Sequence, residues 1–356
     1  MKTFIRMIVL TLVTLIIQQS AFFYIEKIYL NTDADITVEK VDESNEEKSE
    51  KNEEIQLKSN VEDVSLSDDG RYVAYLENSK LKVLDSNSGS ETQVSTKDNE
   101  TIVCYKWLTN ENNMIIIKKV KDGKKSYFEP ITYYAKKDET RSLTDFDVSQ
   151  IKIGINNDKE KVENVIFSTA TSSLYIKVKK PNGKSDLYSL NIMNQLELVR
   201  KNKDIGDIIV PATTTKCVME MGNNVTILDK SDNIQIPNVN IVKILGTDIN
   251  DNVYFGEEIN GNITKIYYSV LNDSTKNKWK SLTLSKPVKK ENIAIDYTGR
   301  IFVNDNESKV VNELTSGQSI KYEGEYVQIY SKGIISRTGS KLLKNEIKDT
   351  RLIKNY

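Results

Sequence analysis

The sequence predicts an all-β fold in which one four-strand unit is repeated around a ring, and three observations predict it. The phrase VSLSDDGRYVAYL at residues 64–76, followed by LKVLDSNSG, reads as strand, Asp-Gly turn, strand, turn and strand. Weaker copies of this phrase recur along the chain at spacings of about 40–50 residues, as in repeat architectures. The 18 tyrosines and five prolines, with many Ile, Val and Thr, favour strands punctuated by turns.

The N-terminal residues 1–31 predict a membrane anchor. Lys2 and Arg6 precede a mostly apolar run at residues 7–25, which as a helix spans about 28 Å and matches a bilayer core. The flanking positive charges predict a cytoplasmic N-terminus, so everything after the single span is expected outside the cell membrane. A cleaved signal peptide is the alternative, but no A-x-A-like site follows the run.

Residues 32–57 predict an acidic, disordered spacer. The segment holds ten Asp or Glu and three Lys, so its net charge is near −7, and it has almost no apolar periodicity. Such a segment cannot bury enough apolar surface to fold by itself. A docking segment for a basic partner is the alternative. The remaining residues, 58–356, carry a net charge near +4.

Residues 58–356 predict a β-propeller of six or seven blades. Gly70 and Asn112 occupy equivalent turns 42 residues apart, and Asp251 and Gly299 occupy equivalent turns 48 residues apart. At about 40–45 residues per blade, seven blades fit best, with the last blade combining N- and C-terminal strands. A closed ring leaves no exposed sheet edge. Two smaller β-sandwiches are the competing all-β arrangement.

The phrase at residues 67–89 resembles the repeat of Tol-type, WD-repeat-like propellers, which the propeller domain of prolyl-oligopeptidase-like peptidases shares. Ser67, Asp69 and Gly70 match the Ser-Pro-Asp-Gly turn of that repeat, with Asp68 in the place of its proline. Val73-Ala74-Tyr75 matches the following strand, and Leu81, Val83 and Asp85 match the next. The resemblance covers one blade well and the second fairly. It implies a propeller that binds proteins or peptides, without the hydrolase domain of the peptidases.

The composition argues against most enzymatic chemistry. The chain contains no histidine, which removes Ser-His-Asp and Cys-His nucleophiles and histidine-ligated metals. Cys104 and Cys217 are expected to be separate buried thiols, with a disulfide as the alternative. Asp85-x-Asn87-x-Gly89 and Asp248-x-Asn250-x-Asn252 begin like calcium loops, but the first lacks a Glu at position twelve and the second has Val253 where Gly is required. We therefore expect no catalytic residues, no metal and no cofactor.

Two groups of residues are candidates for partner contacts. Two predicted hairpin tips are basic and are expected on one face of the ring, where they would meet an anionic surface: Lys118, Lys119, Lys121, Lys124, Lys125, Lys177, Lys179, Lys180 and Lys184. The simpler interpretation is that these lysines only solubilise exposed turns. In Tyr133-Tyr134 and Tyr267-Tyr268 one ring of each pair is expected to pack between blades, and the other is a candidate stacking surface.

The sequence therefore predicts a membrane-anchored, extracytoplasmic β-propeller that acts as a non-catalytic protein-binding or scaffold module. The expected partners are the membrane, through the N-terminal helix, and a protein of unknown identity; no nucleic-acid partner is expected. The main alternative is a carboxylate-dependent, glycan-active or lyase-type enzyme on the propeller face, since a carboxylate pair does not need histidine. A ligand sensor is disfavoured because only about six residues precede the apolar run.

Overall fold

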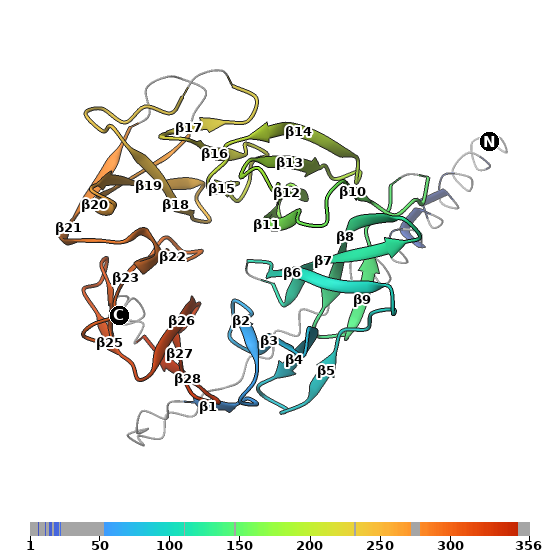
Figure 1. Ribbon diagram of the computed structural model, residues 1–356, viewed down its shortest axis with the longest axis horizontal. Coiled ribbons are helices and arrows are strands. Elements are labelled where there is room, and N and C mark those ends of the chain that lie inside the picture. The colour runs from blue at the N-terminus through green and yellow to red at the C-terminus, as the bar shows by residue number, and fades with distance from the viewer. Residues whose placement is uncertain are drawn as a thin grey trace. The chain divides into compact units, whose positions relative to one another are not determined.

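In the computed structural model, the strands between residues 53 and 347 form a ring of seven antiparallel sheets (Figure 1). The structure describes residues 53–347 except 110, 146, 231–232 and 272–277. It also describes eight separate helical positions nearer the N-terminus: Arg6, Thr11, Thr14, Leu15, Gln18, Gln19, Ser20 and Phe22. The prediction of seven blades is confirmed.

Each sheet is one blade, and its strands follow the chain from the centre of the ring outward. The innermost strands are β2 (Glu62–Leu66), β6 (Glu100–Trp107), β11 (Lys161–Ser168), β15 (Ile208–Ile209), β18 (Val242–Thr247), β22 (Ile293–Ile295) and β26 (Glu325–Tyr330). A single 3-10 turn, η1 (Lys290–Asn292), precedes β22. We number the blades 1 to 7 in this order.

Second strands in the blades are β3 (Tyr72–Glu77), β7 (Asn113–Asp122), β12 (Ser173–Lys179), β16 (Val218–Met221), β19 (Asn252–Ile259), β23 (Ile301–Asp305) and β27 (Gly333–Thr338). Third strands are β4 (Lys80–Asp85), β8 (Lys125–Tyr134), β13 (Ser185–Leu190), β17 (Asn224–Ile227), β20 (Asn262–Val270), β24 (Val310–Glu313) and β28 (Lys341–Glu346).

The outer strands are the least regular part of the ring. They are β5 (Glu91–Gln93), β14 (Leu196–Lys203), β21 (Lys280–Val288), β25 (Ser319–Lys321), β1 (Glu53–Gln56) and, in blade 2, both β9 (Glu139–Ser142) and β10 (Ile153–Ile155). Both β9 and β10 pair with β8, so residues 143–152 leave the sheet edge as a loop between them. Blade 4 has only a bridge between Thr226 and Asn233 at this position among the described residues.

Because the strands of each blade alternate in direction, the ring has two distinct faces. We call the face that carries the turns from first to second strands, and from third to fourth strands, the AB face. The opposite face, which carries the turns from second to third strands, is the BC face. These names follow from the antiparallel pairing within every blade.

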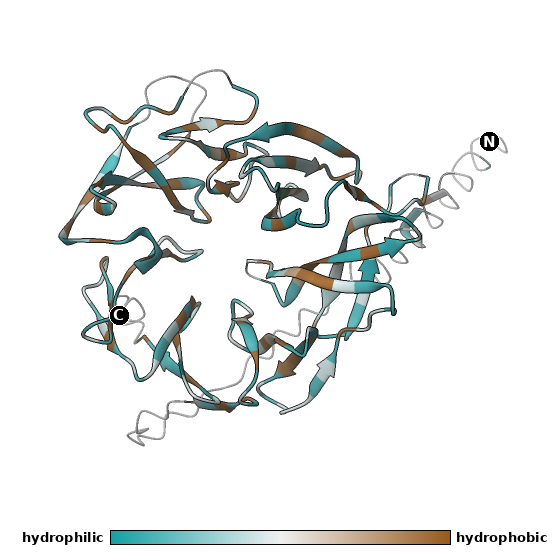
Figure 2. Cartoon of the chain, in the orientation of Figure 1, coloured by the Kyte–Doolittle hydropathy of each residue, from teal (hydrophilic) through white to brown (hydrophobic). Residues whose placement is uncertain are grey.

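The core is a set of apolar layers between neighbouring blades. Along β3, Val73 packs toward blade 7 and Ala74 toward blade 2, because successive strand residues face opposite sides of a sheet. Seven such clusters occur, one at each junction of adjacent blades. Figure 2 shows the consequence, since hydrophobic segments alternate with hydrophilic ones in all blades.

Blade 7 closes the ring by combining both ends of the described chain. β1 pairs with β28, where Ile55 lies opposite Leu342, and the Leu57 N–H donates to the Ser340 carbonyl at 2.7 Å. Ile55 and Leu57 are buried in the layer between blades 7 and 1. Composition alone placed residues 53–57 in the spacer, but these two apolar side chains give the segment a buried face.

The rest of the predicted spacer, residues 32–52, lies outside the described residues, as does most of the predicted anchor at residues 1–31. Over the positions that the structure does describe, no helix has both the length and the apolar character needed to span a membrane.

The two cysteines are free, as predicted. Cys217 is buried between blades 3 and 4, and Cys104 is partly buried between blades 2 and 3. Burial raises the pKa of the Cys104 thiol to about 11 and that of the Cys217 thiol to about 12. Both groups are therefore protonated, inert apolar side chains near neutral pH.

We predict that Ile55→Ala lowers the free energy of unfolding of the propeller by about 2–5 kcal/mol, because it empties part of the layer that closes the ring. Glu54→Ala is the matched control on the same strand, since it removes only an exposed ion pair to Lys341, which is worth less than about 1 kcal/mol. Urea denaturation followed by tryptophan fluorescence measures both. Equal midpoints for the two variants would contradict closure through β1.

Candidate binding face

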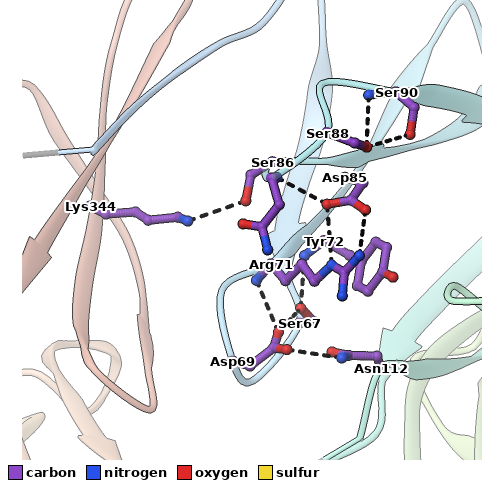
Figure 3. A network of polar contacts seen from close by, with 11 residues as sticks. Ser67, Asp69, Arg71, Tyr72, Asp85, Ser86, Ser88, Ser90, Asn112 and Lys344 are labelled. Atoms are coloured by element: carbon purple, nitrogen blue, oxygen red, sulfur yellow. Dashed lines mark hydrogen bonds and ion pairs between the residues drawn. The ribbon is translucent and has the colours of Figure 1, made fainter. Parts of the chain in front are cut away.

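The AB face is built from turns that an aspartate holds in place. In blade 1, Asp69 Oδ1 accepts hydrogen bonds from the Ser67 hydroxyl at 2.6 Å and from the Arg71 N–H at 2.9 Å (Figure 3). The Tyr72 N–H closes the turn by donating to Ser67 Oγ at 3.0 Å. Gly70 has φ +72°, and a Cβ there would lie 2.7 Å from the Tyr330 ring of blade 7. The Ser67-x-Asp69-Gly70 sequence of this turn is thus a requirement of the backbone.

The loops that resembled calcium sites use their carboxylates in the same way. Asp248 accepts four hydrogen bonds, from the N–H groups of Asn250 and Asn252, the Asn252 amide and the Tyr254 hydroxyl. The Asp85 carboxylate binds the Arg71 guanidinium through both oxygens, at 3.2 and 2.8 Å. These carboxylates are engaged by the protein itself, which accounts for the Asp- and Asn-rich turns.

Hydrogen bonds connect these turns from blade to blade at six junctions. They run from Ser331 N to Asp68 O (2.8 Å), from Asn112 Nδ2 to Asp69 Oδ2 (2.9 Å), from Ser168 Oγ to Ala212 O (3.0 Å), from Thr213 N to Asp251 Oδ1 (2.8 Å), from Ile249 N to Tyr297 O (2.8 Å) and from Arg300 Nη2 to Ser331 O (2.6 Å).

The junction of blades 2 and 3 differs from the other six. Among the described residues, no hydrogen bond joins the turn after β6 to the turn after β11. A cavity of about 360 Å³ occupies this position instead, with Leu108, Ile115, Phe167 and Leu174 in its walls. It adjoins a second cavity of about 270 Å³ in the central channel, because Leu108, Ile115, Phe167 and Thr169 line both.

Apolar side chains project from the turns around this junction. Ile192 is 72% exposed and Met193 52% exposed on the turn between β13 and β14, and Val148 is 79% exposed on the loop between β9 and β10. The Asn194 amide ties the two turns together by donating to the Thr144 carbonyl at 2.8 Å. We call the cavity between blades 2 and 3, with these three side chains, the blade 2–3 groove.

The described part of the loop that carries Val148 has a strained backbone. Asp145 Oδ1 accepts from the N–H groups of Asp147 at 3.0 Å and Ser149 at 2.8 Å, which fixes the turn. Val148 has φ +60°, a left-handed conformation that is costly for a β-branched residue. The left-handed backbone at Val148 therefore destabilises the fold while it holds an apolar side chain exposed to solvent. Backbone strain of this kind is concentrated at functional sites.

The nine predicted lysine contacts separate into two groups. The topology confirms that both basic hairpins join second to third strands, so their tips share the BC face. Lys121, Lys124, Lys125 and Lys184 are exposed there. The structure thus brings these four to one face, opposite the blade 2–3 groove.

The other five lysines are engaged within their blades. Lys118 and Lys177 lie within strands and are buried, and they pair with Glu100 at 3.1 Å and Glu163 at 2.9 Å. The assignment of these two to an exposed tip is therefore wrong, because β7 and β12 extend past them before the chain turns. The remaining pairs are Lys119 with Asp158, Lys179 with Glu163 and Lys180 with Asp186.

The tyrosine pairs behave as predicted. Tyr133 is buried between blades 1 and 2, while Tyr134 lines the blade 2–3 groove. Tyr268 stacks on Tyr254 with ring centroids 5.0 Å apart, and Tyr267 packs toward blade 4. At least one ring of each pair thus packs between blades, as predicted, and in the second pair both rings do.

Sequence reasoning missed the groove because its residues come from segments far apart in the chain. The loop at 143–152 looked like an ordinary connection, although the pair Ile192-Met193 in a polar turn was a visible signal. An apolar pair in a turn between two strands is an exception to the polar pattern of turns.

No protein-family model matches the sequence, and no curated protein matches it. Among solved structures, the β-propeller domain of Cps50 (Swd1) from Myceliophteria thermophila is similar over 83% of this chain and 100% of its own, at 8% identity and a TM-score of 0.53. A chain of the Mitotic Checkpoint Complex is similar over 90% and 98%, at 10% identity and a TM-score of 0.48.

Acylaminoacyl peptidase from Pyrococcus horikoshii is similar over 77% of this chain and 49% of its own, at 12% identity and a TM-score of 0.44, so the chain spans about half of that enzyme. Identities this low show the fold alone. The chain has a WD40-like, seven-bladed β-propeller fold, and the predicted resemblance to WD-repeat-like propellers is confirmed at that level.

Asp68 and Asp69, the two aspartates of the blade 1 turn, have pKa values that shift in opposite directions, so the pH dependence of stability tests the hydrogen bonds of this turn. Burial raises the pKa of Asp68, assisted by the neighbouring Asp296 and Asp69 charges. Burial also acts on Asp69, but the hydrogen bonds from Ser67, Arg71 and Asn112 outweigh it and lower the pKa of this carboxyl. Ionised Asp69 thus stabilises the fold above the carboxyl pKa of the unfolded chain, while ionised Asp68 destabilises it.

We predict that at pH 7 Asp69→Asn lowers the unfolding midpoint in urea and Asp68→Asn raises it. The contribution of Asp69 disappears as the pH falls through its lowered pKa, and the cost of Asp68 disappears as the pH falls through its raised pKa, so both differences from wild type shrink toward acidic pH. The two variants are matched controls for each other. Shifts in the same direction at pH 7 would contradict the assignment of the hydrogen bonds to Asp69.

Proposed function

We propose that this propeller is a non-catalytic protein-binding module whose partner docks in the blade 2–3 groove. The observation that carries the proposal is the exposure of Val148, Ile192 and Met193 on turns beside a cavity with apolar side chains in its walls. Soluble proteins rarely expose apolar side chains in groups, and such groups commonly mark interaction sites. WD40-like propellers commonly serve as scaffolds for protein assembly, which supports the same conclusion.

The groove has the anatomy of a recognition site. Its lining combines apolar side chains with the polar side chains of Glu111, Asn113 and Asn194. Apolar anchors in a pocket with a polar rim provide most of the binding energy in protein interfaces. Within the described residues, no hydrogen bond joins the turn after β6 to the turn after β11, which leaves the groove open to a partner.

We predict that a photocrosslinking amino acid at Met193 captures a specific partner from living cells, and that the additional change Ile192→Asp abolishes capture. Ile259 is the matched control position, because it is also an exposed apolar residue but lies at a hairpin tip on the BC face. Crosslinked species are identified by mass spectrometry. Equal capture at both positions, or capture that survives Ile192→Asp, would contradict docking in the groove.

The exposed lysines of the BC face are a second candidate contact, for an anionic partner. Lys121, Lys124, Lys125 and Lys184 support it by their exposure on one face. Reversing these four to Glu tests it, since association with an anionic surface would weaken and would do so most at low salt. If the groove is the docking site, capture at Met193 is unaffected by this reversal.

We further propose that residues 7–25 tether the propeller to the cell membrane, with the propeller on the extracytoplasmic side. The support is the apolar run itself and the positive residues Lys2 and Arg6 before it. The acidic residues of 32–52 would then separate the tether from β1. In this arrangement the propeller acts as a scaffold that holds its partner near the membrane.

We predict that the full chain stays in the membrane fraction after alkaline carbonate extraction, whereas a chain lacking residues 1–31 is released. External protease should reach the propeller in intact spheroplasts, because the positive-inside rule places it outside. Release of the full chain by carbonate would contradict the tether. Protection from external protease would contradict the proposed orientation.

A further inference from the structure

A second candidate site lies at the inner end of the blade 2–3 groove, in the central channel. The cavity of about 270 Å³ there is surrounded by the ends of the inner strands of blades 2 to 6. Its walls are largely apolar, with Ile115, Phe167 and Ile295 among them. Its volume is near the lower end of the range for small-molecule sites, which is about 300–1,000 Å³.

One cationic side chain lines this cavity. Lys106, near the end of β6, is accessible to water but forms no ion pair or hydrogen bond with any described residue. The inner strands around the amine desolvate it and lower its pKa, although Cys104 and Asp207 act in the opposite direction. An amine in this environment lacks a counter-ion, and a bound anion would supply one.

Hydrogen-bond donors that the fold does not use surround the same space. The hydroxyls of Thr109, Thr247 and Tyr297 line the cavity and form no hydrogen bond with described residues. Asp248 also lines it, but its carboxylate already accepts from two backbone N–H groups, the Asn252 amide and the Tyr254 hydroxyl. The cavity therefore offers apolar walls, several hydroxyl donors and one cation, and this cation is unpaired among the described residues.

We propose that the channel cavity binds a small organic carboxylate with an apolar body, whose carboxylate pairs with Lys106 Nζ and whose body contacts Ile115 and Phe167. The site is complementary to this class because it places a cation, which can form a charge-assisted hydrogen bond with a carboxylate, beside apolar walls that can contact the body of the ligand. A neutral apolar ligand would leave the ammonium without a partner, and a polyanion would be repelled by Asp248. This ligand class goes beyond the proposed function, since the docking of a protein in the groove does not require it.

The test compares 4-phenylbutyrate with 4-phenylbutyramide as probes of the folded propeller, by ligand-observed NMR and calorimetry. We expect Lys106→Met to weaken 4-phenylbutyrate binding by about 10- to 100-fold, as for the loss of a charge-assisted hydrogen bond. Lys161→Met is the matched control, because Lys161 is an exposed lysine on the inner strand β11 that does not line the cavity. The amide should bind weakly and equally to all three proteins.

The affinity for the carboxylate should also decrease with rising pH, because it depends on the protonation of Lys106. Only the protonated amine pairs with the anion, so affinity falls as the pH rises through the lowered pKa of Lys106. Lys106→Arg keeps its charge over that range and should retain the affinity. The other ionisable groups near this amine are Cys104, Asp207, Asp248 and Tyr297. Replacing Asp207 by Asn should lower the pKa of Lys106 further and move the pH midpoint down.

Two results would overturn the proposal: equal affinity of wild type and Lys106→Met for 4-phenylbutyrate, or no binding to wild type at about 10 mM probe. The natural carboxylate could belong to a small ligand or to the docked protein. Photocrosslinking at Met193, repeated in the Lys106→Met background, distinguishes these two sources. Unchanged capture identifies a small ligand that is independent of the partner. Lost capture places the carboxylate on the docked protein and overturns the small-ligand assignment.

Discussion

The apolar contact between adjacent blades is the interaction on which the rest of the structure depends. Each blade is a sheet with two apolar faces, and neither face is buried until a neighbour packs on it. The seven layers therefore stabilise one another around the ring, and the β1–β28 pairing supplies the last of them. Every turn on the AB and BC faces is held by this arrangement, so exposed side chains such as Met193 are presented on a rigid support.

The junction of blades 2 and 3 differs from the other six junctions between blades, and this difference is the basis of the candidate binding site. Six junctions on the AB face are joined by hydrogen bonds between turns, including the Asn112–Asp69 contact in Figure 3. At the junction of blades 2 and 3, apolar cavities and exposed apolar side chains take their place. The strained backbone at Val148 lies near this junction, as does Lys106, which pairs with none of the described residues. Features that lower the stability of a fold in this way are found most often at functional sites.

Much of the fold was predictable from the sequence because its signals are local. The Ser67-x-Asp69-Gly70 turn and the alternating strand that follows it define a blade within about 25 residues. The spacer boundary was less predictable, since Ile55 and Leu57 acquire a buried face only by pairing with β28, some 285 residues later in the chain. Lys118 and Lys177 were assigned to hairpin tips because charge in the sequence does not reveal where a strand ends.

The candidate site was not predictable for a similar reason. It combines Leu108, Phe167 and Ile192, whose proximity depends on how blades 2 and 3 pack, and sequence spacing carries no information about a missing hydrogen bond. The position of Lys106 beside the cavity, without a partner in the described part of the chain, is likewise a property of the assembled channel, since in the sequence it is one lysine within an ordinary strand. Tertiary packing, rather than local propensity, decides both.

Hydrogen–deuterium exchange of the propeller with and without its captured partner tests the central claim most directly, because it reports on both faces in one measurement. Docking in the blade 2–3 groove predicts slower exchange on partner binding at residues 108–113, 143–152 and 190–196, with the BC-face tips at 121–125 and 180–184 unchanged. Protection of those tips, with residues 143–152 and 190–196 unaffected, would contradict the account.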